Sequence, residues 1–254
     1  MMKISLIVTT YNRPDALDKV LDSVSKLRFI PEVVIADDGS GHETKNIVDK
    51  WKKTLPIIHA WQEDRGFRAA SARNLAVAKS TGDYLIFIDG DCLVLPNFIG
   101  KHVELSENGF MVAGNRILFS KQLTEKTLID KLRPLEWGIR EWLFARLTNK
   151  VNRLLPLINL PNGMFRKIRK TKWQGVRTCN LGMFKNDFLS VNGFDESFQG
   201  WGHEDADLAI RLIKNGIQRK DGQFGTAVLH LWHRENDRSH ESANKKKALQ
   251  GIGE

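Results

Sequence analysis

The sequence predicts an α/β domain with a mostly parallel, Rossmann-like twisted sheet and helices on both of its faces. Apolar runs rich in β-branched residues alternate with helical patterns along most of the chain, as in βαβ units. The runs are nearly continuous, which is typical of strands buried on both faces. Hydrophobic residues make up 41% of the chain and charged residues 27%, an ordinary composition for a soluble globular protein.

The elements follow in order along the chain. The apolar runs predict strands at residues 4–8, 33–35, 57–59, 84–88, 110–112 and 226–232. Apolar residues at helical spacing predict a helix that starts at Pro14 and further helices at 69–79, 98–105 and 204–214. The sequence after Arg234 is polar and rich in lysine, which predicts a loosely held tail over 236–254.

A basic segment interrupts this rhythm. Apolar residues at helical spacing over 123–158 predict an amphipathic helix or helical pair, broken near Pro134, and 159–177 reads as a basic loop. Residues 121–177 hold 14 Lys and Arg against 4 Asp and Glu, a net charge of +10, whereas the rest of the chain holds 25 against 26. A local excess of this kind indicates a negatively charged partner. We therefore expect a single domain divided into 1–118, a basic helical insertion at 119–177, 178–235 and the tail.

Several classes of protein are unlikely on composition. No run approaches the ~18 apolar residues of a membrane-spanning helix. The short apolar run near the N-terminus leads into TTYNRP without a small-residue cleavage site, so it reads as a strand and not as a signal peptide. Cys92 and Cys179 have no metal-type spacing and read as core residues of a cytoplasmic protein.

The stretch YLIFIDGDC at 84–92 ends an apolar strand in two carboxylates, Asp89 and Asp91, separated by Gly90. Two adjacent carboxylates repel each other unless a cation lies between them, and Mg²⁺ and Mn²⁺ prefer oxygen ligands. A solvated turn explains this short motif equally well. Three further strand ends carry polar residues, however, in TTYNRP (9–14), IADDGS (35–40) and QEDRGFRAASARN (62–74). Because parallel strands end at one edge of a sheet, the four together predict a ligand site there.

These stretches, together with GFDESFQGWGHEDADLAIRL at 193–212, resemble the family 2 glycosyltransferases of the GT-A fold. The last stretch is also similar to the C-terminal signature of β-1,4-galactosyltransferase and chondroitin-polymerase type enzymes. The resemblance covers most of 3–118 and 178–233 and is weak over 120–177. It implies that 1–118 binds a nucleotide sugar and that 178–235 forms the acceptor and catalytic half.

The resemblance implies a donor site for a UDP-sugar and a divalent metal, Mn²⁺ or Mg²⁺. The residues implied to line the uridine pocket are Thr10, Tyr11, Asn12 and Arg13. Those implied to hold uracil and ribose are Asp37 and Asp38, with Asp64, Arg68 and Arg73 continuing the nucleotide wall. In the DxD motif, Asp91 is implied to contact the metal, with Asp89 nearer the ribose or the donor sugar. Relatives place a further metal ligand after a late strand, where His230 and His233 are the candidates; three positions apart in a strand, they would face opposite ways unless the strand has ended.

On the acceptor side, the resemblance implies that Asp205 is the general base and that Glu204 holds the acceptor or the donor sugar. We expect the helix start to keep Asp205 deprotonated, although acidic residues there are also ordinary caps. Trp201 can stack on a sugar ring, and its glycine neighbours, Gly202 among them, would let the loop move as a lid. His203 and Asn180 are further candidates for contact with the acceptor.

The function expected on these grounds is inverting, metal-dependent transfer of a hexose or N-acetylhexosamine from a UDP-sugar. The acceptor would be an oligosaccharide or a lipid-linked saccharide of lipopolysaccharide- or capsule-type glycan synthesis. A nucleotidyltransferase is an alternative, but the first strand is not followed by its glycine-rich loop. A nucleic-acid-binding protein would leave the acidic strand ends unexplained, so we expect no nucleic-acid partner. The protein is expected in the cytoplasm. Residues 121–177 either dock it on the anionic inner membrane, bind an anionic acceptor, or pack on the domain.

Overall fold

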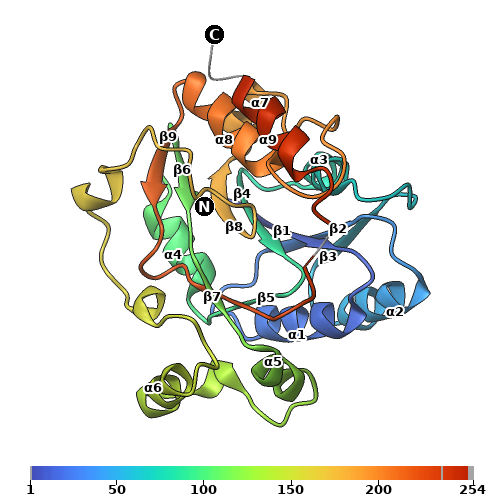
Figure 1. The fold of residues 1–254 in the computed structure, drawn as a ribbon, viewed down its shortest axis with the longest axis vertical. Helices are drawn as coiled ribbons and strands as arrows, with labels where there is room; N and C mark the ends of the chain where they lie inside the picture. Colours follow the sequence, from blue (N-terminus) through green and yellow to red (C-terminus); the bar gives the residue numbers. More distant parts are fainter. Residues whose placement is uncertain (1, 236, 251–254) are drawn as a thin grey trace.

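The computed structural model describes residues 2–235 and 237–250. A seven-stranded sheet forms the centre, in the order β3-β2-β1-β4-β8-β6-β9 (Figure 1). Its strands are β3 (Ile57–Trp61), β2 (Glu32–Asp37), β1 (Ile4–Thr10), β4 (Tyr84–Asp89), β8 (Asn180–Phe184), β6 (Phe110–Ala113) and β9 (Gln218–Asp221). The first four are parallel, and β8 runs antiparallel to both β4 and β6. The prediction of a mostly parallel sheet is therefore confirmed.

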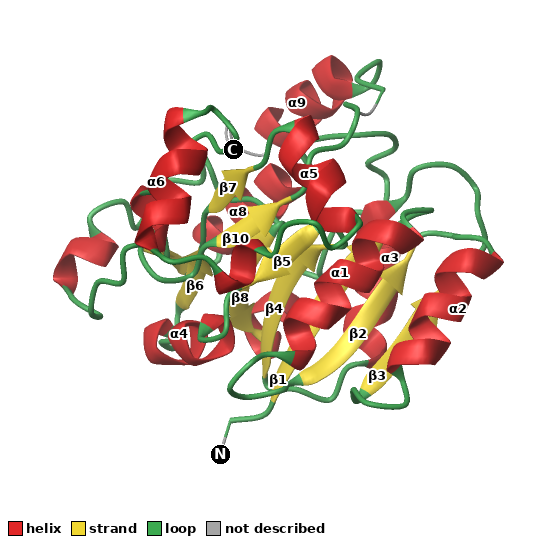
Figure 2. Ribbon diagram, turned by 90° about the horizontal axis from the view of Figure 1, so that it is seen from below, coloured by secondary structure: helices red, strands yellow, loops and turns green. Residues whose placement is uncertain are grey.

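Helices cover both faces of this sheet (Figures 1 and 2). The helices are α1 (Pro14–Ser25), α2 (His42–Trp51), α3 (Ala69–Lys79), α4 (Phe98–Leu105), α5 (Lys121–Leu128), α6 (Ile139–Leu147), α7 (Lys185–Ser190), α8 (Glu204–Lys214) and α9 (Glu241–Gln250). Alternate side chains of each parallel strand enter two separate cores. In β1, Leu6 packs with α1 on one face while Ile7 packs with α3 and α8 on the other. Burial on both faces explains why these strands are continuously apolar in sequence.

The register of the parallel strands brings their carboxyl ends to one line. Thr10 of β1 pairs with Asp37 of β2, Asp37 pairs with Trp61 of β3, and Thr9 pairs with Asp89 of β4. A second, three-stranded sheet continues beyond this line, in the order β5-β10-β7. Its strands are β5 (Cys92–Val94), β10 (Val228–His230) and β7 (Arg116–Leu118). In this small sheet, β5, which directly follows the DxD motif, pairs with β10, the strand that ends at His230.

The sequence did not predict every element. Strand β9 was missed because its four residues, QRKD, are polar or charged. Its buried Lys220 is satisfied by the carboxylate of Glu107 at 2.6 Å and the backbone oxygen of Leu105 at 3.0 Å, so burial does not require an apolar residue there. Helix α2 was missed as well, since only two of its residues, Thr44 and Val48, are buried.

The insertion leaves the domain after β7 and rejoins it at β8. Its expected helical pair is confirmed as α5 and α6, with the short 3₁₀ turn η1 (Pro134–Glu136) between them. Two more 3₁₀ turns follow, η2 (Leu155–Leu157) and η3 (Met164–Lys167). Among the helices of residues 2–235 and 237–250, none has the length and hydropathy that a membrane span requires.

The prediction of a loosely held tail is wrong for residues 241–250. These residues form α9, which packs against α8 and buries Asn244 and Ala248. Polar and lysine-rich composition alone did not reveal it, because two buried side chains suffice to fix so short a helix on a larger domain. Residue 236 and residues 251–254 of the expected tail lie outside the described residues.

Candidate active site

The turn at Asp89–Asp91 is fixed by close contact with the end of β1. The backbone N–H of Gly90 donates to the carbonyl oxygen of Thr9 at 2.6 Å. A Cβ atom at Gly90 would lie 2.9 Å from that oxygen and 3.1 Å from Oγ1 of Thr10. A side chain at this position would therefore push the two strands apart. Glycine lets Asp89 and Asp91 sit on either side of a tight junction between β1 and β4.

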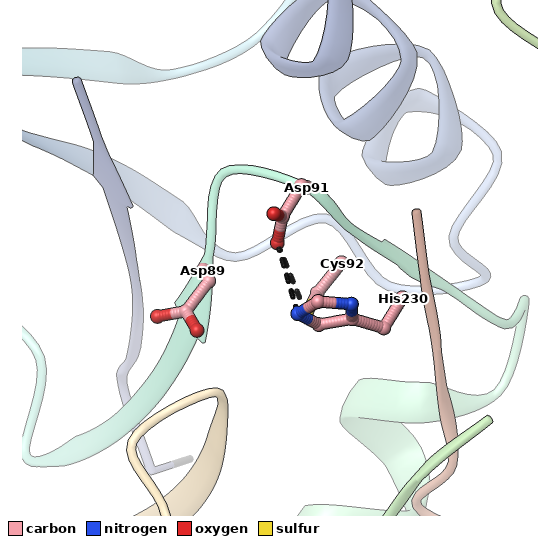
Figure 3. Close-up of side chains that lie close together, drawn as sticks. All are labelled: Asp89, Asp91, Cys92 and His230. Carbon is pink, nitrogen blue, oxygen red and sulfur yellow. Dashed lines mark hydrogen bonds and ion pairs between the residues drawn. The ribbon is translucent and has the colours of Figure 1, made fainter. Parts of the chain in front are cut away.

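Asp91 faces both histidines of the late strand. Its Oδ1 lies 3.6 Å from Nε2 of His230, and its Oδ2 lies 3.5 Å from Nε2 of His233. Figure 3 shows the Asp91 carboxylate turned toward the His230 ring. Because β10 ends at His230, the alternation of side chains does not extend to His233, and both rings reach one carboxylate. Burial lowers the pKa of His230, which favours the neutral imidazole that binds metals.

The donor set at this turn fits a hard divalent cation. Potential ligand atoms of Asp89, Asp91, Cys92 and His230 lie within 4.8 Å of one another (Figure 3). Burial, together with a hydrogen bond to Cys179, raises the pKa of Cys92 well above its usual value, so this thiol stays protonated and is a poor metal ligand. Two carboxylates and imidazole nitrogen remain, which are suitable ligands for Mn²⁺ or Mg²⁺. Both cysteines are buried, as expected of core residues.

Arg73 joins the DxD motif to α8. It donates to Oγ1 of Thr9 at 3.0 Å and to Oε1 of Glu204 at 2.9 Å, and it lies 3.4 Å from Oδ1 of Asp89. Only 5% of Arg73 is exposed. A buried guanidinium between two carboxylates fixes both of them relative to β1. Burial raises the pKa of Asp89, Asp91 adds to the rise, and Arg73 opposes it.

Asp205 begins α8 beside Glu204 and has an unusual acidity. Burial raises its pKa to about 7, and the negative charge of Glu204 contributes to the rise. The helix start was expected to keep Asp205 deprotonated, whereas desolvation is the largest influence on this group and raises its pKa against the attraction to Arg73. A carboxylate with a pKa near 7 can both accept and release a proton at neutral pH, as a general base must.

The two carboxylates at the end of β2 are occupied by the protein itself. Asp37 is fully buried and accepts hydrogen bonds from the Ser40 N–H at 2.8 Å and from His59 at 2.8 Å. Asp38 accepts from Gln62 Nε2 and from the Arg68 N–H, each at 2.6 Å. Burial raises the pKa of Asp38. These contacts order the loops after β2 and β3, and the expected contacts with uracil and ribose stay a prediction.

The exposed groups on this side belong to neighbouring loops. Tyr11 is 45% exposed and donates to Oδ2 of Asp64 at 2.9 Å. Asn12, with a positive φ of 47°, links its loop to the next one by accepting from the Gly41 N–H at 3.0 Å. Arg13 pairs with Asp15 at the surface. Thr10 is buried, and its Oγ1 has no hydrogen-bond partner within residues 2–235 and 237–250.

Two residues of this region were missed in the sequence. Trp61 ends β3 beside Asp37, is 48% exposed, and donates its indole N–H to the carbonyl oxygen of Ser40 at 3.0 Å. Arg116 starts β7 and points toward Cys179, with its NH1 3.8 Å from the sulfur, and its charge acts on Asp89. Trp61 could have been identified as a candidate site residue because it ends a predicted strand. No motif or spacing in the sequence identified Arg116.

The acceptor-side loop before α8 has a constrained backbone. Gly200, Gly202 and His203 have positive φ angles of 72°, 104° and 71°. Such values suit glycine, but they are uncommon for histidine and often occur at functional sites. The guanidinium of Arg238 stacks on Trp201 at 5.0 Å, so the C-terminal segment covers the indole that was expected to meet a sugar.

The structure contradicts the expected role of Asn180 as an acceptor contact. Asn180 is 1% exposed, and its Nδ2 donates to the carbonyl oxygens of Asn115 and Thr226. Its Oδ1 lies 3.0 Å from Nε2 of the buried His102. With its amide so engaged, Asn180 ties β8 to the segments beside it and cannot reach a sugar.

Comparison with known proteins identifies the family. Residues 5–172 match the profile described as glycosyl transferase family 2. The chain belongs to this family. Residues 164–233 also match a profile described as the N-terminal domain of galactosyltransferase. The family resemblance seen in the sequence is thus confirmed.

Known relatives of this family 2 member are longer chains. Validoxylamine A glucosyltransferase of Streptomyces hygroscopicus subsp. limoneus is 30% identical over 231 residues, covering 84% of this chain and 48% of that protein. Chondroitin synthase of Pasteurella multocida (strain Pm70) is 28% identical over 236 residues, covering 84% of this chain and 23% of that protein. The chain therefore spans about half the length of the first relative and about a quarter of the second.

Solved structures share the fold of this family 2 member at low sequence identity. S. aureus TarS matches with a TM-score of 0.64 at 17% identity, covering 99% of this chain and 39% of that one. The mannosyltransferase PcManGT from Pyrobaculum calidifontis, solved with GDP-Man and Mn²⁺, matches with a TM-score of 0.61 at 16% identity, covering 98% and 69%. The GT-A-type fold expected from the sequence is confirmed.

Proposed function

We propose that this chain is an inverting, metal-dependent glycosyltransferase that moves a hexose or N-acetylhexosamine from a UDP-sugar to a saccharide acceptor. The observation that carries the proposal is the approach of Asp91 to two imidazoles at 3.5–3.6 Å, with Arg73 connecting the adjacent Asp89 to Glu204, the neighbour in sequence of Asp205, whose pKa is about 7. One group suits a cation, and the other suits a proton transfer. A nucleotide-sugar transfer needs both.

The metal-binding residues would be Asp91, His230 and His233, with Asp89 on the donor side. A bound divalent ion neutralises the charge that develops on the diphosphate leaving group. Arg73 holds Asp89 in place through its guanidinium. Asp89 can then accept hydrogen bonds from hydroxyl groups of the ribose or the donor sugar, while Asp91 remains directed toward the histidines.

In the transfer step, Asp205 accepts the proton of an acceptor hydroxyl. The freed oxygen forms a bond to the anomeric carbon on the face opposite the diphosphate, the bond from that carbon to the phosphate oxygen breaks, and UDP leaves with the electron pair. This displacement inverts the anomeric configuration. Glu204 has one oxygen held by Arg73 at 2.9 Å, so its second oxygen can orient a sugar hydroxyl beside Asp205.

The nucleotide would bind across the loops after β1 and β3. Tyr11 and Trp61 present exposed aromatic surface there, and Asp64 lies within hydrogen-bond distance of Tyr11. Aromatic rings of this kind favour stacking of a base. TarS was solved with UDP-GlcNAc and PcManGT with GDP-Man, so these structures do not select the base, and uracil is proposed from the family resemblance of TTYNRP and ADDGS.

The acceptor is proposed to be a saccharide of a surface glycan of the lipopolysaccharide or capsule type. The names of relatives such as validoxylamine A glucosyltransferase and chondroitin synthase point to sugar-containing acceptors or products. The loop at 200–203, with its half-buried glycines and Trp201, is the part of the site that would meet this acceptor. The position of the glycosidic linkage in the product would be set by which hydroxyl group of the acceptor reaches Asp205.

The proposal is tested by measuring nucleoside diphosphate release from a panel of UDP-sugars and GDP-mannose, with Mn²⁺, with Mg²⁺ and with EDTA. We expect release from at least one UDP-sugar and its loss in EDTA, with recovery when metal is restored. Release that is indifferent to EDTA would remove the metal role. An α-linked product from an α-linked donor, identified by NMR, would contradict inversion.

A further inference from the structure

The basic insertion exposes more apolar surface than any other part of the described chain. Its core-facing side chains are accounted for by packing, since Trp142 and Ala145 of α6 are buried against Phe119 and Trp137. The side chains on the opposite side of α6 do not pack against the domain. Ile139, Leu143 and Leu147, spaced four residues apart, form a stripe on that side that is exposed to solvent.

This exposure continues after α6. The six most exposed large hydrophobic side chains among residues 2–235 and 237–250 all lie in the insertion: Leu147 (80%), Ile168 (79%), Met164 (78%), Ile139 (76%), Ile129 (61%) and Leu155 (60%). Single exposed apolar residues are normal on a protein surface, but a cluster confined to one segment marks an interaction site.

The same segment is strongly basic. Residues 142–177 contain nine Lys and Arg and no Asp or Glu. Two of the nine serve the fold, since Arg166 donates to four backbone carbonyl groups and Lys167 pairs with Glu107. Within the described residues, the other seven make no ion pair with a carboxylate: Arg146, Lys150, Arg153, Arg169, Lys170, Lys172 and Arg177. Their charge is available to an anionic partner.

Apolar and basic residues occupy one side of the molecule. Both ribbon views place α6 and the chain that follows it along the same flank, away from α1, α2 and α3 (Figures 1 and 2). We propose that this basic flank, residues 139–177, docks the protein on an anionic lipid surface. Exposed Ile, Leu and Met would enter the boundary between headgroups and acyl chains, and the surrounding Lys and Arg would meet lipid phosphates.

Other occupants fit these residues less well. A second copy of the chain would bring the same unpaired positive charge to the contact, which opposes self-association. Single-stranded nucleic acid would match the charge, but it is bound through aromatic stacking, and five of the six most exposed apolar side chains are Leu or Ile, with none aromatic among the six. An anionic bilayer offers both an apolar interior and negative charge.

The flank is connected to the candidate active site through Phe119, which forms an isolated β-bridge with Val151 of the flank. The Phe119 N–H donates to the carbonyl oxygen of His230 at 2.9 Å, and the Trp232 N–H donates to Oγ1 of Thr124 at 2.7 Å. The insertion is thus attached to the segment that carries both histidines. Docking through the flank would hold the site near the bilayer, where an acceptor attached to a lipid would be presented. The inference goes beyond the proposed transfer and does not depend on the donor sugar.

Co-sedimentation with vesicles tests the inference. We expect the full chain to bind vesicles of phosphatidylglycerol and phosphatidylcholine at low salt, and to bind pure phosphatidylcholine at least about tenfold less. Two variants address the two components: Ile139→Ser with Leu147→Ser, and Lys170→Gln with Lys172→Gln. Each pair should weaken binding to the anionic vesicles on the order of tenfold, because exposed side chains are changed without loss of core packing.

Matched controls lie elsewhere on the surface. Ile30→Ser with Leu189→Ser changes two exposed apolar residues, and Lys245→Gln with Lys246→Gln changes two exposed lysines of α9. Both controls should bind vesicles as the unchanged chain does. The inference is overturned by absent binding at low salt, by equal loss in test and control pairs, or by a dimer in light scattering that the Ile139 and Leu147 changes dissolve.

Nucleoside diphosphate release in the absence of vesicles separates this inference from the proposed function. We expect the flank variants to release UDP at the unchanged rate, because none of these side chains belongs to the candidate site. A chain that binds vesicles through the flank but releases no nucleoside diphosphate would retain this inference and lose the proposed function.

Discussion

At the end of β2, Asp37 and Asp38 accept hydrogen bonds from backbone and side-chain donors of their own loops, whereas at the end of β4 Asp91 faces two histidines and Asp89 faces one arginine. In sequence the two strand ends look alike, each with two carboxylates after an apolar run. The difference lies in what surrounds them. Hydrogen-bond donors already satisfy Asp37 and Asp38, so these carboxylates help to hold their loops together. Asp91 instead faces histidines, which can bind a cation themselves, so its oxygens remain available to a metal ion.

The largest expected effect comes from Asp91→Asn. An amide cannot supply the charge that a divalent ion requires, so we expect nucleoside diphosphate release to fall about 10²–10³-fold or more. The melting temperature should stay within about 2 °C of the unchanged protein, since the substitution also removes repulsion with Asp89. Asp49→Asn, at an exposed carboxylate of α2, is the control and should change neither quantity. Full activity of Asp91→Asn would show that the carboxylate at the end of β4 is not needed for metal binding, and would contradict the proposed difference between the two strand ends.

Asp205→Asn extends the comparison to the acceptor side. Loss of a general base should lower the transfer rate about 10²–10⁴-fold. In the unchanged protein the base acts when deprotonated, and its pKa is about 7, so the rate should rise with pH through that region. The check is a pH profile of transfer to a saccharide acceptor at saturating donor. A profile that is flat between pH 6 and 8 would argue against Asp205 as the base.

Asp37→Ala should have the opposite signature to Asp91→Asn. Removing the buried carboxylate leaves the Ser40 N–H and His59 without their partner, which should cost about 2–3 kcal/mol of unfolding free energy. The melting temperature should fall by roughly 5–10 °C. Activity measured well below that temperature should be reduced less than in Asp91→Asn. An unchanged melting temperature, with activity lost, would mean that Asp37 binds ligand directly.

The smallest effect concerns stability as a function of pH. The pKa of Asp205 in the folded protein is raised above its value in the unfolded chain, so the charged carboxylate opposes folding in full above pH of about 7, and this cost decreases as the pH falls from there toward the unfolded value. Asp205→Asn should therefore raise the melting temperature by a few degrees at pH 8 and by less at pH 5.5. Thermal unfolding of both proteins at the two values gives the answer, and a gain that is larger at pH 5.5 would contradict it.

Much of the fold could be predicted because its signals are local. Continuous apolar runs located four parallel strands, and the register then aligns their ends as a parallel sheet requires. Strand β9 and helix α9 carried no such signal, since their stability depends on contacts made far along the chain, such as Lys220 with Glu107. A sequence pattern gives the chemical type of each residue, but it does not show which residue far along the chain will form a hydrogen bond or ion pair with it.

The candidate site was predictable to the same degree. Asp91 was expected near one of His230 and His233, which would face opposite ways in a continuing strand, and the structure brings both within 4 Å of it. The acidity of Asp205 was predicted with the wrong sign because burial was not visible in the sequence. Asn180 was assigned to the acceptor on its neighbourhood in the chain, yet its amide is used by backbone carbonyl groups of two other segments.

The position of β10 between β5 and β7 also has a consequence for synthesis on the ribosome. Strands β1 to β4 and both carboxylates of the DxD turn emerge early, but the histidines that face Asp91 belong to residues 230 and 233. While the nascent chain lacks β10, the gap between β5 and β7 presents unpaired strand edges to chaperones and to other chains. Substitutions that weaken β10 should therefore lower the yield of protein in cells before they alter its chemistry.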